Sequence, residues 1–211
     1  MMVNKQAKHE QNQERIRQLV KDIEQQPNDT TSYLELSALL LEQKAFTEAI
    51  ELLQKAHALV AKPELLDFNL AVAYYYDGQY DAALNLLAQL PVEDTVLYQQ
   101  ALIFFKQGNI KKALAFVLTI KKMTDESQEL LGDIWLALGA TKQAKEALMQ
   151  IPVAARSAKV WFMLGVTSST NSKDSAEGYF AKSRELDSEY FTTAMKQYEG
   201  VLALVREKND D

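Results

Sequence analysis

The sequence predicts an all-α protein built from antiparallel helix pairs. Prolines stand only between apolar-periodic segments, where a helix must end, at Pro27, Pro63, Pro91 and Pro152. Glycines separate neighbouring apolar segments at Gly78, Gly108 and Gly139, in the position of a left-handed residue that closes a helix. Strand patterns are nearly absent, and 211 residues at 47% hydrophobic can bury a sizeable core. The expected order is helix, short turn, helix and a longer break, several times over.

The first expected element lies within residues 1–29, a polar stretch followed by a capping helix. One apolar stripe precedes Pro27, and its members are Ile16, Leu19, Val20 and Ile23. Charged residues such as Arg15 and Lys21 fall on the other side of this helix, where water can solvate them. The stripe predicts a single helix that covers the apolar end of the series of helix pairs.

A repeat follows from residue 30 onward. A shift of 34 residues carries Ala49 to Ala83 and Phe46 to Tyr80. The alanine recurs at Ala113, Ala144 and Ala176, followed four residues later by Val117, Leu148 and Phe180. A small residue recurs three residues before a mostly large one, at Ser37, Ala71, Ala101, Gly132 and Gly165. Small residues at these positions let two antiparallel helices approach closely.

This pattern resembles the tetratricopeptide repeat family, which has a large residue, Leu-Gly, an aromatic residue and Ala-x-x-x-Phe at a 34-residue period. The matching segments are "KAFTEAIELLQKA", "GQYDAALNLL", "LLGDIW" and "WFMLG". The resemblance covers residues 30–187 and implies a right-handed superhelical solenoid of about five repeats, at 30–63, 64–93, 94–124, 125–157 and 158–187. It also implies that the first helix of each pair lines a concave groove. Gln100 and Ser168 depart from the pattern.

The last expected element is a C-terminal capping helix and short tail over residues 188–211. Asp187 or Ser188 can cap a helix over 188–208, and Asn209 to Asp211 are expected to be free. The apolar stripe of this helix is Phe191, Met195, Tyr198, Leu202 and Val205. We expect it either to pack on the second helix of repeat five, near Phe180, or to fold back into the groove.

Three adjacent tyrosines define the expected binding face. Tyr74 fits the aromatic position that packs within its own helix pair, so Tyr75 and Tyr76 point about 100° and 200° away from it. The groove is expected to be aromatic in repeats two and three and acidic in repeat four. Its expected lining is Leu34, Leu41, Phe68, Val72, Tyr75, Tyr76, Tyr98, Leu102, Phe105, Glu129, Asp133 and Phe162. The alternative is that these rings pack only between neighbouring repeats.

Composition limits the function classes. A formal charge of −6 argues against nucleic acid or an anionic membrane as the main partner, because both require excess Lys and Arg. The chain has no cysteine, His9 and His57 are far apart, and no phosphate-binding glycine loop occurs. Glu126, Glu129 and Asp133 fall on one helical face and could pair with a basic partner or face water.

We therefore expect a protein that is not an enzyme and needs no cofactor or metal. It would act as a protein-protein interaction adaptor or scaffold that binds a protein segment or peptide in its apolar groove. The alternative is a structural module that uses the same surface to form a homodimer. No apolar stretch resembles a signal peptide or a membrane span, so a cytoplasmic location is expected.

Overall fold

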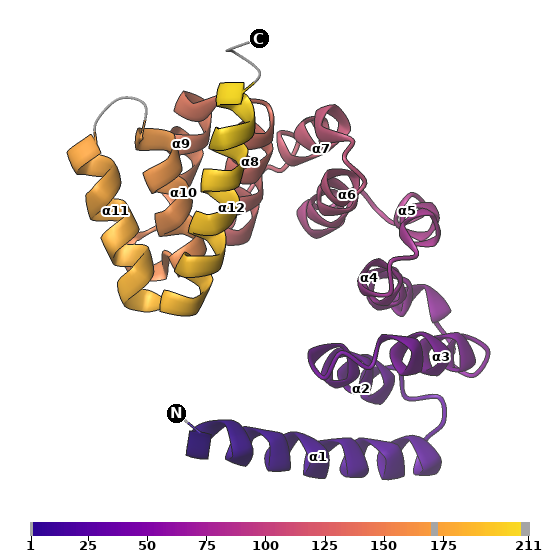
Figure 1. The fold of residues 1–211 in the computed structure, drawn as a ribbon. Coiled ribbons are helices and arrows are strands. Elements are labelled where there is room, and N and C mark those ends of the chain that lie inside the picture. The colour runs from indigo at the N-terminus through magenta and orange to yellow at the C-terminus, as the bar shows by residue number, and fades with distance from the viewer. Residues whose placement is uncertain (1, 170–172, 208–211) are drawn as a thin grey trace. The chain divides into compact units, whose positions relative to one another are not determined.

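The computed structural model describes the backbone of residues 2–169 and 173–207, with side chains for 10–169 and 175–203. All secondary structure in these ranges is helical, which confirms the predicted all-α class (Figure 1). The chain divides into two compact units, unit 1 over Met1–Gln107 and unit 2 over Gly108–Asp211. The expected freedom of Asn209 to Asp211 lies outside the described residues.

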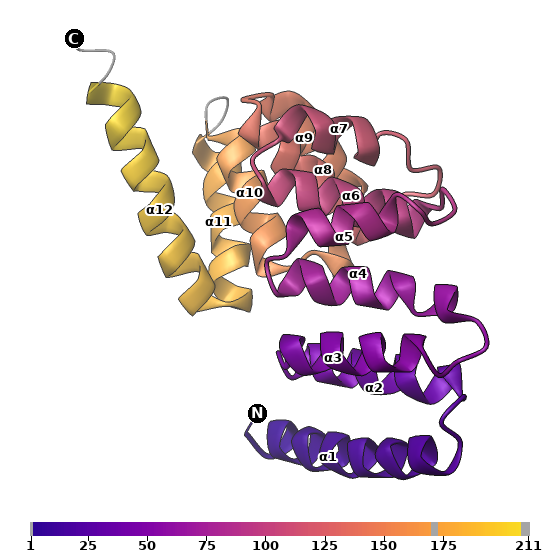
Figure 2. The ribbon, with the colours of Figure 1, turned by 90° about the vertical axis from the view of Figure 1, so that its right-hand side faces the viewer.

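Unit 1 contains a long first helix followed by two helix pairs and the first helix of a third. Its helices are α1 (Met2–Gln25), α2 (Thr30–Glu42), α3 (Phe46–His57), α4 (Asp67–Tyr76), α5 (Tyr80–Leu87) and α6 (Asp94–Lys106). A short 3-10 helix, η1 (Pro63–Leu65), starts at one of the four prolines and precedes α4. Figure 2 shows α2 and α3 side by side as a pair.

Unit 2 contains a single helix, two helix pairs and a terminal helix. Its helices are α7 (Ile110–Val117), α8 (Asp125–Ala137), α9 (Thr141–Gln150), α10 (Ala158–Ser168), α11 (Lys173–Leu186) and α12 (Ser188–Glu207). The 3-10 helix η2 (Val153–Ala155) follows Pro152 and connects α9 to α10. The prolines therefore mark breaks between helix pairs, as predicted.

The short turns inside the pairs are closed by left-handed residues. Gly78 has φ 82°, and Gly108 and Gly139 have φ 75° and 72°. After α4, Gly78 donates its backbone N–H to the carbonyl of Tyr75, and Gln79 donates to the carbonyl of Tyr74. These two bonds form a Schellman motif, which satisfies carbonyls that the helix end would leave without donors. The glycines were correctly predicted to close helices.

Close packing within a pair depends on the small residues of the repeat. A Cβ atom added to Gly132 would lie 2.6 Å from Leu148, and one added to Gly165 would lie 2.4 Å from the Phe180 ring. Ala83 has no solvent exposure. Since Leu148 and Phe180 are the large residues of the Ala-x-x-x-large pattern, the repeat register places them against the small residues of the partner helix.

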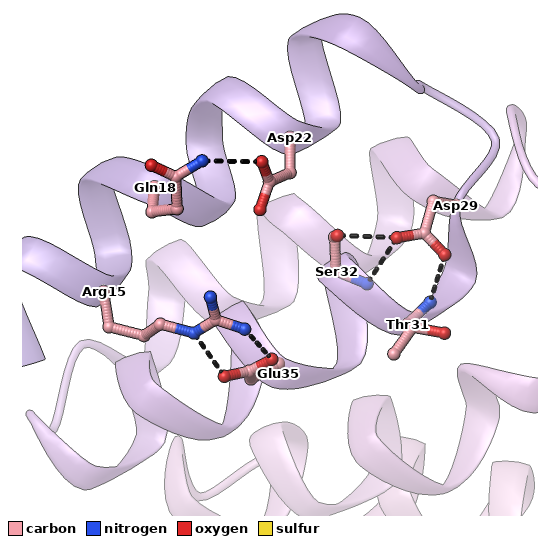
Figure 3. A network of polar contacts seen from close by, with 7 residues as sticks. All are labelled: Arg15, Gln18, Asp22, Asp29, Thr31, Ser32 and Glu35. Carbon is pink, nitrogen blue, oxygen red and sulfur yellow. Dashed lines mark hydrogen bonds and ion pairs between the residues drawn. The ribbon is translucent and has the colours of Figure 1, made fainter.

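Helix α1 packs on α2 through its stripe, although one stripe member faces water. Leu19 is buried, whereas Val20 is 42% exposed. Ile23 packs against the first core cluster, a group of buried residues mainly from α2, α3 and α4 that includes Tyr33 and Leu53. Beside the stripe, the Arg15 guanidinium donates two hydrogen bonds to the Glu35 carboxylate of α2, at 2.6 and 2.5 Å (Figure 3). This contact raises the pKa of Arg15 and lowers that of Glu35.

The start of α2 is defined by its N-cap. The Asp29 carboxylate accepts hydrogen bonds from the backbone N–H groups of Thr31 and Ser32 and from the Ser32 hydroxyl (Figure 3). An acceptor at this position satisfies N–H groups that have no partner inside the helix. These hydrogen bonds, led by that from the Ser32 hydroxyl, hold the pKa of Asp29 below its ordinary value.

Helix α12 covers both helices of the last pair in unit 2. Phe191 is buried, with ring centroids 6.2 Å from Phe180 and 6.0 Å from Phe162. Tyr190 lies beside Lys159 at the start of α10, and the Tyr198 hydroxyl lies 2.9 Å from that of Ser169 just after α10 ends. Helix α12 therefore runs in the same direction as α10.

This placement resolves where the terminal helix packs. Phe68 in unit 1 has the same repeat position as Phe162, and it packs against a cluster that includes Val96 and Ile103 of α6. Relative to α10, helix α12 thus stands where the first helix of a following repeat would stand. It contacts Phe180, named in the first expected placement, and also Phe162, which was expected to line the groove. Its backbone is helical over Ser188–Glu207. The side chain of Val205 lies outside the described residues.

Candidate functional site

Four aromatic rings form one contiguous group in unit 1, which we call the aromatic patch. Its members are Phe46, Tyr75, Tyr76 and Tyr80. The ring centroids of Phe46 and Tyr76 are 5.4 Å apart with the planes 13° from parallel, so these rings stack. Tyr75 meets Tyr76 edge-on at 5.1 Å and lies 6.0 Å from Tyr80. The two short turns after α2 and α4 place these rings at the carboxyl end of α4 and the amino ends of α3 and α5.

Tyr75 and Tyr76 differ sharply in exposure. Tyr75 is 9% exposed, whereas Tyr76 is 53% exposed. Burial, and then the neighbouring Tyr76, Tyr80 and Tyr98, raise the pKa of Tyr75 to about 12, so its hydroxyl stays neutral at physiological pH. Tyr75 is therefore part of the core, and Tyr76 presents a ring to solvent while Phe46 supports it from one side.

Tyr74 packs away from the patch. It is half-buried between the core clusters on either side of α4, and its hydroxyl accepts a hydrogen bond of 2.9 Å from the Gln54 amide of α3. The ring thus contacts the preceding repeat as well as its own pair. The sequence pattern had placed it only within its own pair.

The other residues expected to line the groove in unit 1 are half-buried. Leu34 and Leu41 of α2 pack against the first core cluster. Phe68 of α4 and Leu102 of α6 pack against a second cluster, whose buried residues are Ala71, Tyr75, Ala83, Leu87, Val96 and Ile103. The remaining half-buried members are Val72, Tyr98 and Phe105. Among the described side chains of the expected lining, Tyr76 has the most exposed aromatic ring.

The sequence analysis did not assign Phe46 and Tyr80 to the binding face. Both begin the second helix of a pair, and the 34-residue shift relates one to the other. Ring contacts with Tyr75 and Tyr76 bring them into the patch. The shared repeat position and aromatic character were the signal available in the sequence.

The acidic residues expected in repeat four are paired within unit 2. The Lys159 ammonium lies 2.6 Å from the Asp133 carboxylate and 2.8 Å from that of Glu129. Burial alone would lower the pKa of Lys159, but these two carboxylates raise it above its ordinary value. One of the two negative charges on this face is thereby offset from inside the unit. Phe162 is also covered, because rings of α11 and α12 surround it.

Histidine and acidic side chains are the groups of this chain that could bind a metal ion. No group of three or more histidine and acidic side chains within the described ranges could hold a metal ion. His57 lies 3.1 Å from the Asp67 carboxylate, near the surface between α3 and α4, and the side chain of His9 is outside the described residues. Across the part of the chain that the structure covers, no helix combines the length and apolar character needed to cross a membrane.

Comparisons with known proteins agree with the repeat pattern. Residues 40–103 match a family model described as tetratricopeptide repeat. No curated protein matches the chain in sequence. Among solved structures, a chain of the APC/C hetero-tetramer Cut9-Hcn1 is similar with a TM-score of 0.75 and 16% identity. That similarity covers 88% of this chain but only 39% of the other chain.

Two smaller proteins are similar over nearly their whole length. PilF of Pseudomonas aeruginosa has a TM-score of 0.71 at 14% identity, over 92% of each chain. YrrB, described as a TPR protein with an unusual peptide-binding site, has a TM-score of 0.55 at 17% identity, over 85% of this chain and 97% of its own. At these identities the similarity establishes the fold alone.

Proposed function

Because residues 40–103 belong to the tetratricopeptide repeat family and the chain has the fold of its members, we propose that the protein is a noncatalytic interaction module. Its role would be that of an adaptor or scaffold that binds a protein segment or peptide. The proposed contact surface is the aromatic patch of unit 1 together with the half-buried apolar residues of α2, α4 and α6.

The observation that carries the proposal is the exposed ring of Tyr76. Water contacts more than half of this side chain, yet its orientation is held by stacking on Phe46 and by the edge of Tyr75. A preoriented ring offers a partner a large apolar area at little cost in side-chain entropy. YrrB, a protein of the same fold, is described as having a peptide-binding site, which makes a peptide a reasonable class of partner here.

The proposal assigns different roles to the residues that the sequence pattern grouped together. Tyr76 would contact the partner directly, alongside Leu41 and Phe105, which have the repeat position of Tyr75 in the neighbouring first helices. Tyr75 would support the patch from within the core. Glu129, Asp133 and Phe162 belong to the other unit and would be structural, since Lys159 and α12 already occupy them.

Affinity capture from a lysate of the source cells tests the proposal when matched variants are compared. Tyr76→Ala should lose most of the protein captured by the wild type. Leu65→Ala is the matched control, because Leu65 is 54% exposed and lies in η1, before the opposite end of α4. The proposal fails if Tyr76→Ala and Leu65→Ala capture the same proteins in the same amounts.

Light scattering of the purified chain at several concentrations separates a foreign partner from a second copy. A concentration-dependent dimer that Tyr76→Ala dissociates would assign the patch to self-association. A monomer at all concentrations would support the binding of a different protein.

A further inference from the structure

The charged residues of the chain are distributed unevenly between the two units. Residues 30–107 hold ten Asp and Glu residues but only four lysines and no arginine. Residues 1–29 hold five of each sign, and residues 108–211 hold fourteen of each sign. The whole formal charge of −6 therefore belongs to the segment that carries the aromatic patch. Such a one-sided charge attracts partners of opposite sign and speeds their association.

Two of these acidic residues directly follow rings of the patch. Asp77 comes after Tyr76, and Asp81 comes after Tyr80; both are exposed. The Asp77 carboxylate accepts a hydrogen bond of 2.7 Å from the Gln79 amide, and that of Asp81 accepts one of 3.2 Å from the Gln107 amide. Amides carry no charge, so these bonds orient the carboxylates without neutralising them.

The backbone adds to the negative potential at the same place. Tyr76 is the last residue of α4, and the carboxyl end of a helix carries a partial negative charge. An exposed aromatic face is also partially negative because of the ring quadrupole, so it attracts cations within about 6 Å of the centroid. Two lysines occupy related positions: Lys44 in the turn after α2, two residues before Phe46, and Lys106, the last residue of α6, at the repeat position of Tyr76.

We propose that the aromatic patch recognises a basic and apolar protein segment, in which an arginine side chain stacks on the Tyr76 ring. Apolar side chains of the segment contact the remaining patch surface, and Asp77 and Asp81 pair with its flanking cations. Arginine fits better than lysine, because its planar guanidinium stacks on a ring while donating hydrogen bonds in its own plane. This inference rests on the proposed function and specifies its partner chemistry.

Two synthetic peptides provide the probe. They share the same leucine and phenylalanine residues and differ only in carrying arginine or glutamate at every other position. Binding to the full-length chain is measured by fluorescence anisotropy at low and at physiological salt. The arginine peptide should bind at least about tenfold more tightly than the glutamate peptide, and its affinity should fall as salt screens the charges.

Matched variants show whether the peptide binds at the patch or anywhere on an acidic protein. Asp77→Asn with Asp81→Asn should weaken the arginine peptide more than Glu64→Gln with Glu93→Gln does. Both double variants remove two charges, but Glu64 and Glu93 precede α4 and α6. Tyr76→Leu keeps an apolar side chain without the aromatic face, and it should weaken the arginine peptide about two- to fivefold. Melting temperatures establish that each variant is folded.

Equal affinity for both peptides would overturn the inference, as would equal effects of the two double variants or no effect of Tyr76→Leu. If Tyr76→Ala still abolishes capture from lysate in that case, the proposed function stands and only the basic partner chemistry is wrong. If Tyr76→Ala changes neither capture nor peptide binding, both proposals fail.

Discussion

Lys44 adopts the left-handed backbone conformation that glycine adopts in the later turns. Its φ is 61°, and its N–H donates to the carbonyl of Leu41 as that of Gly78 donates to Tyr75. A residue with a Cβ costs about 1–2 kcal/mol in this conformation. Replacing it with glycine recovers only part of this free energy, because glycine also makes the unfolded chain more flexible.

Lys44→Gly should therefore raise the free energy of unfolding by about 0.5–1 kcal/mol. Gly78→Ala is the reciprocal variant and should lower it by a similar amount, since an added Cβ meets nothing within 4 Å and only backbone strain is introduced. Urea denaturation measures both changes. A less stable Lys44→Gly variant would contradict the assigned turn equivalence.

Gln99 in α6 is 6% exposed, and its Nε2 is buried without a hydrogen-bond partner among the described residues. The repeat explains this orphan donor. Asn69 has the same repeat position in α4, and its amide donates to the Ser37 hydroxyl of the preceding first helix at 3.1 Å. Ser37 of α2 corresponds to Ala71 of α4 in the repeat. The first helix that precedes α6 therefore offers Gln99 no hydroxyl at that position.

Gln99→Met should then raise the free energy of unfolding by about 1 kcal/mol, because an unpartnered buried donor costs about 1–3 kcal/mol. Asn69→Leu should lower the stability, since it leaves Ser37 without its donor. Chemical denaturation of both variants decides the matter: if Gln99→Met is as destabilising as Asn69→Leu, the amide of Gln99 has a partner in solution.

Asp29 links the stability of α2 to pH. Its pKa is lowered in the folded state, so its contribution is complete above the unfolded pKa of about 3.9 and is lost as the pH falls through the folded value. Asp29→Ala should cost about 1 kcal/mol near neutral pH, as N-cap replacements do. Urea titrations should show the difference from wild type shrinking below about pH 4. A difference that grows in acid would contradict the cap.

Two glycines in different helix pairs, Gly132 of α8 and Gly178 of α11, allow the effects of packing and of helix propensity to be measured separately. Gly132 faces Leu148 at a distance that no Cβ tolerates, whereas a Cβ at Gly178 of α11 meets nothing within 4 Å. Gly132→Ala should lower the stability by about 1–3 kcal/mol through overpacking. Gly178→Ala should raise it by up to about 1 kcal/mol, because alanine favours helix. Thermal melts that rank the variants in the opposite order would refute the repeat register.

Much of the element arrangement could be predicted from the sequence because local chemistry determines it. Gly78, Gly108 and Gly139 close turns that need a positive φ, and Gly132 and Gly165 stand where a side chain would collide. The exposure of Val20 was not predictable in this way. The apolar stripe of α1 is wider than the surface that contacts α2, so one edge of the stripe faces water. Only the position of the neighbouring helix shows which edge that is.

The candidate site was less predictable for the same reason. Helical geometry directs Tyr75 and Tyr76 away from Tyr74, but it does not say which of them another element covers. Tyr80 and Tyr98 come from elsewhere in unit 1 and crowd around Tyr75, leaving Tyr76 exposed. Likewise, Asp133 pairs with Lys159, which lies 26 residues away in sequence.

At the scale of the whole molecule, α12 completes the packing of unit 2. Truncation after Asp187 would expose Phe162 and Phe180, and would remove the buried Phe191. Each fully buried large apolar side chain contributes about 1.5–3 kcal/mol, so the loss should total several kcal/mol. Both tryptophans, Trp135 and Trp161, lie in unit 2, and their fluorescence in urea reports on it. An unchanged midpoint would mean that α12 is a dispensable tail.

The central claim is that Tyr75 packs in the core whereas Tyr76 binds the partner. Measuring both partner capture and stability for Tyr75→Ala and Tyr76→Ala tests this claim most directly. Tyr75→Ala should lose about 3–5 kcal/mol of stability, as buried aromatic truncations do. Tyr76→Ala should lose no more than about 1.5 kcal/mol from its ring contacts, while most of the captured partner disappears. Capture that declines only in proportion to lost stability in both variants would contradict the claim and make these rings core residues alone.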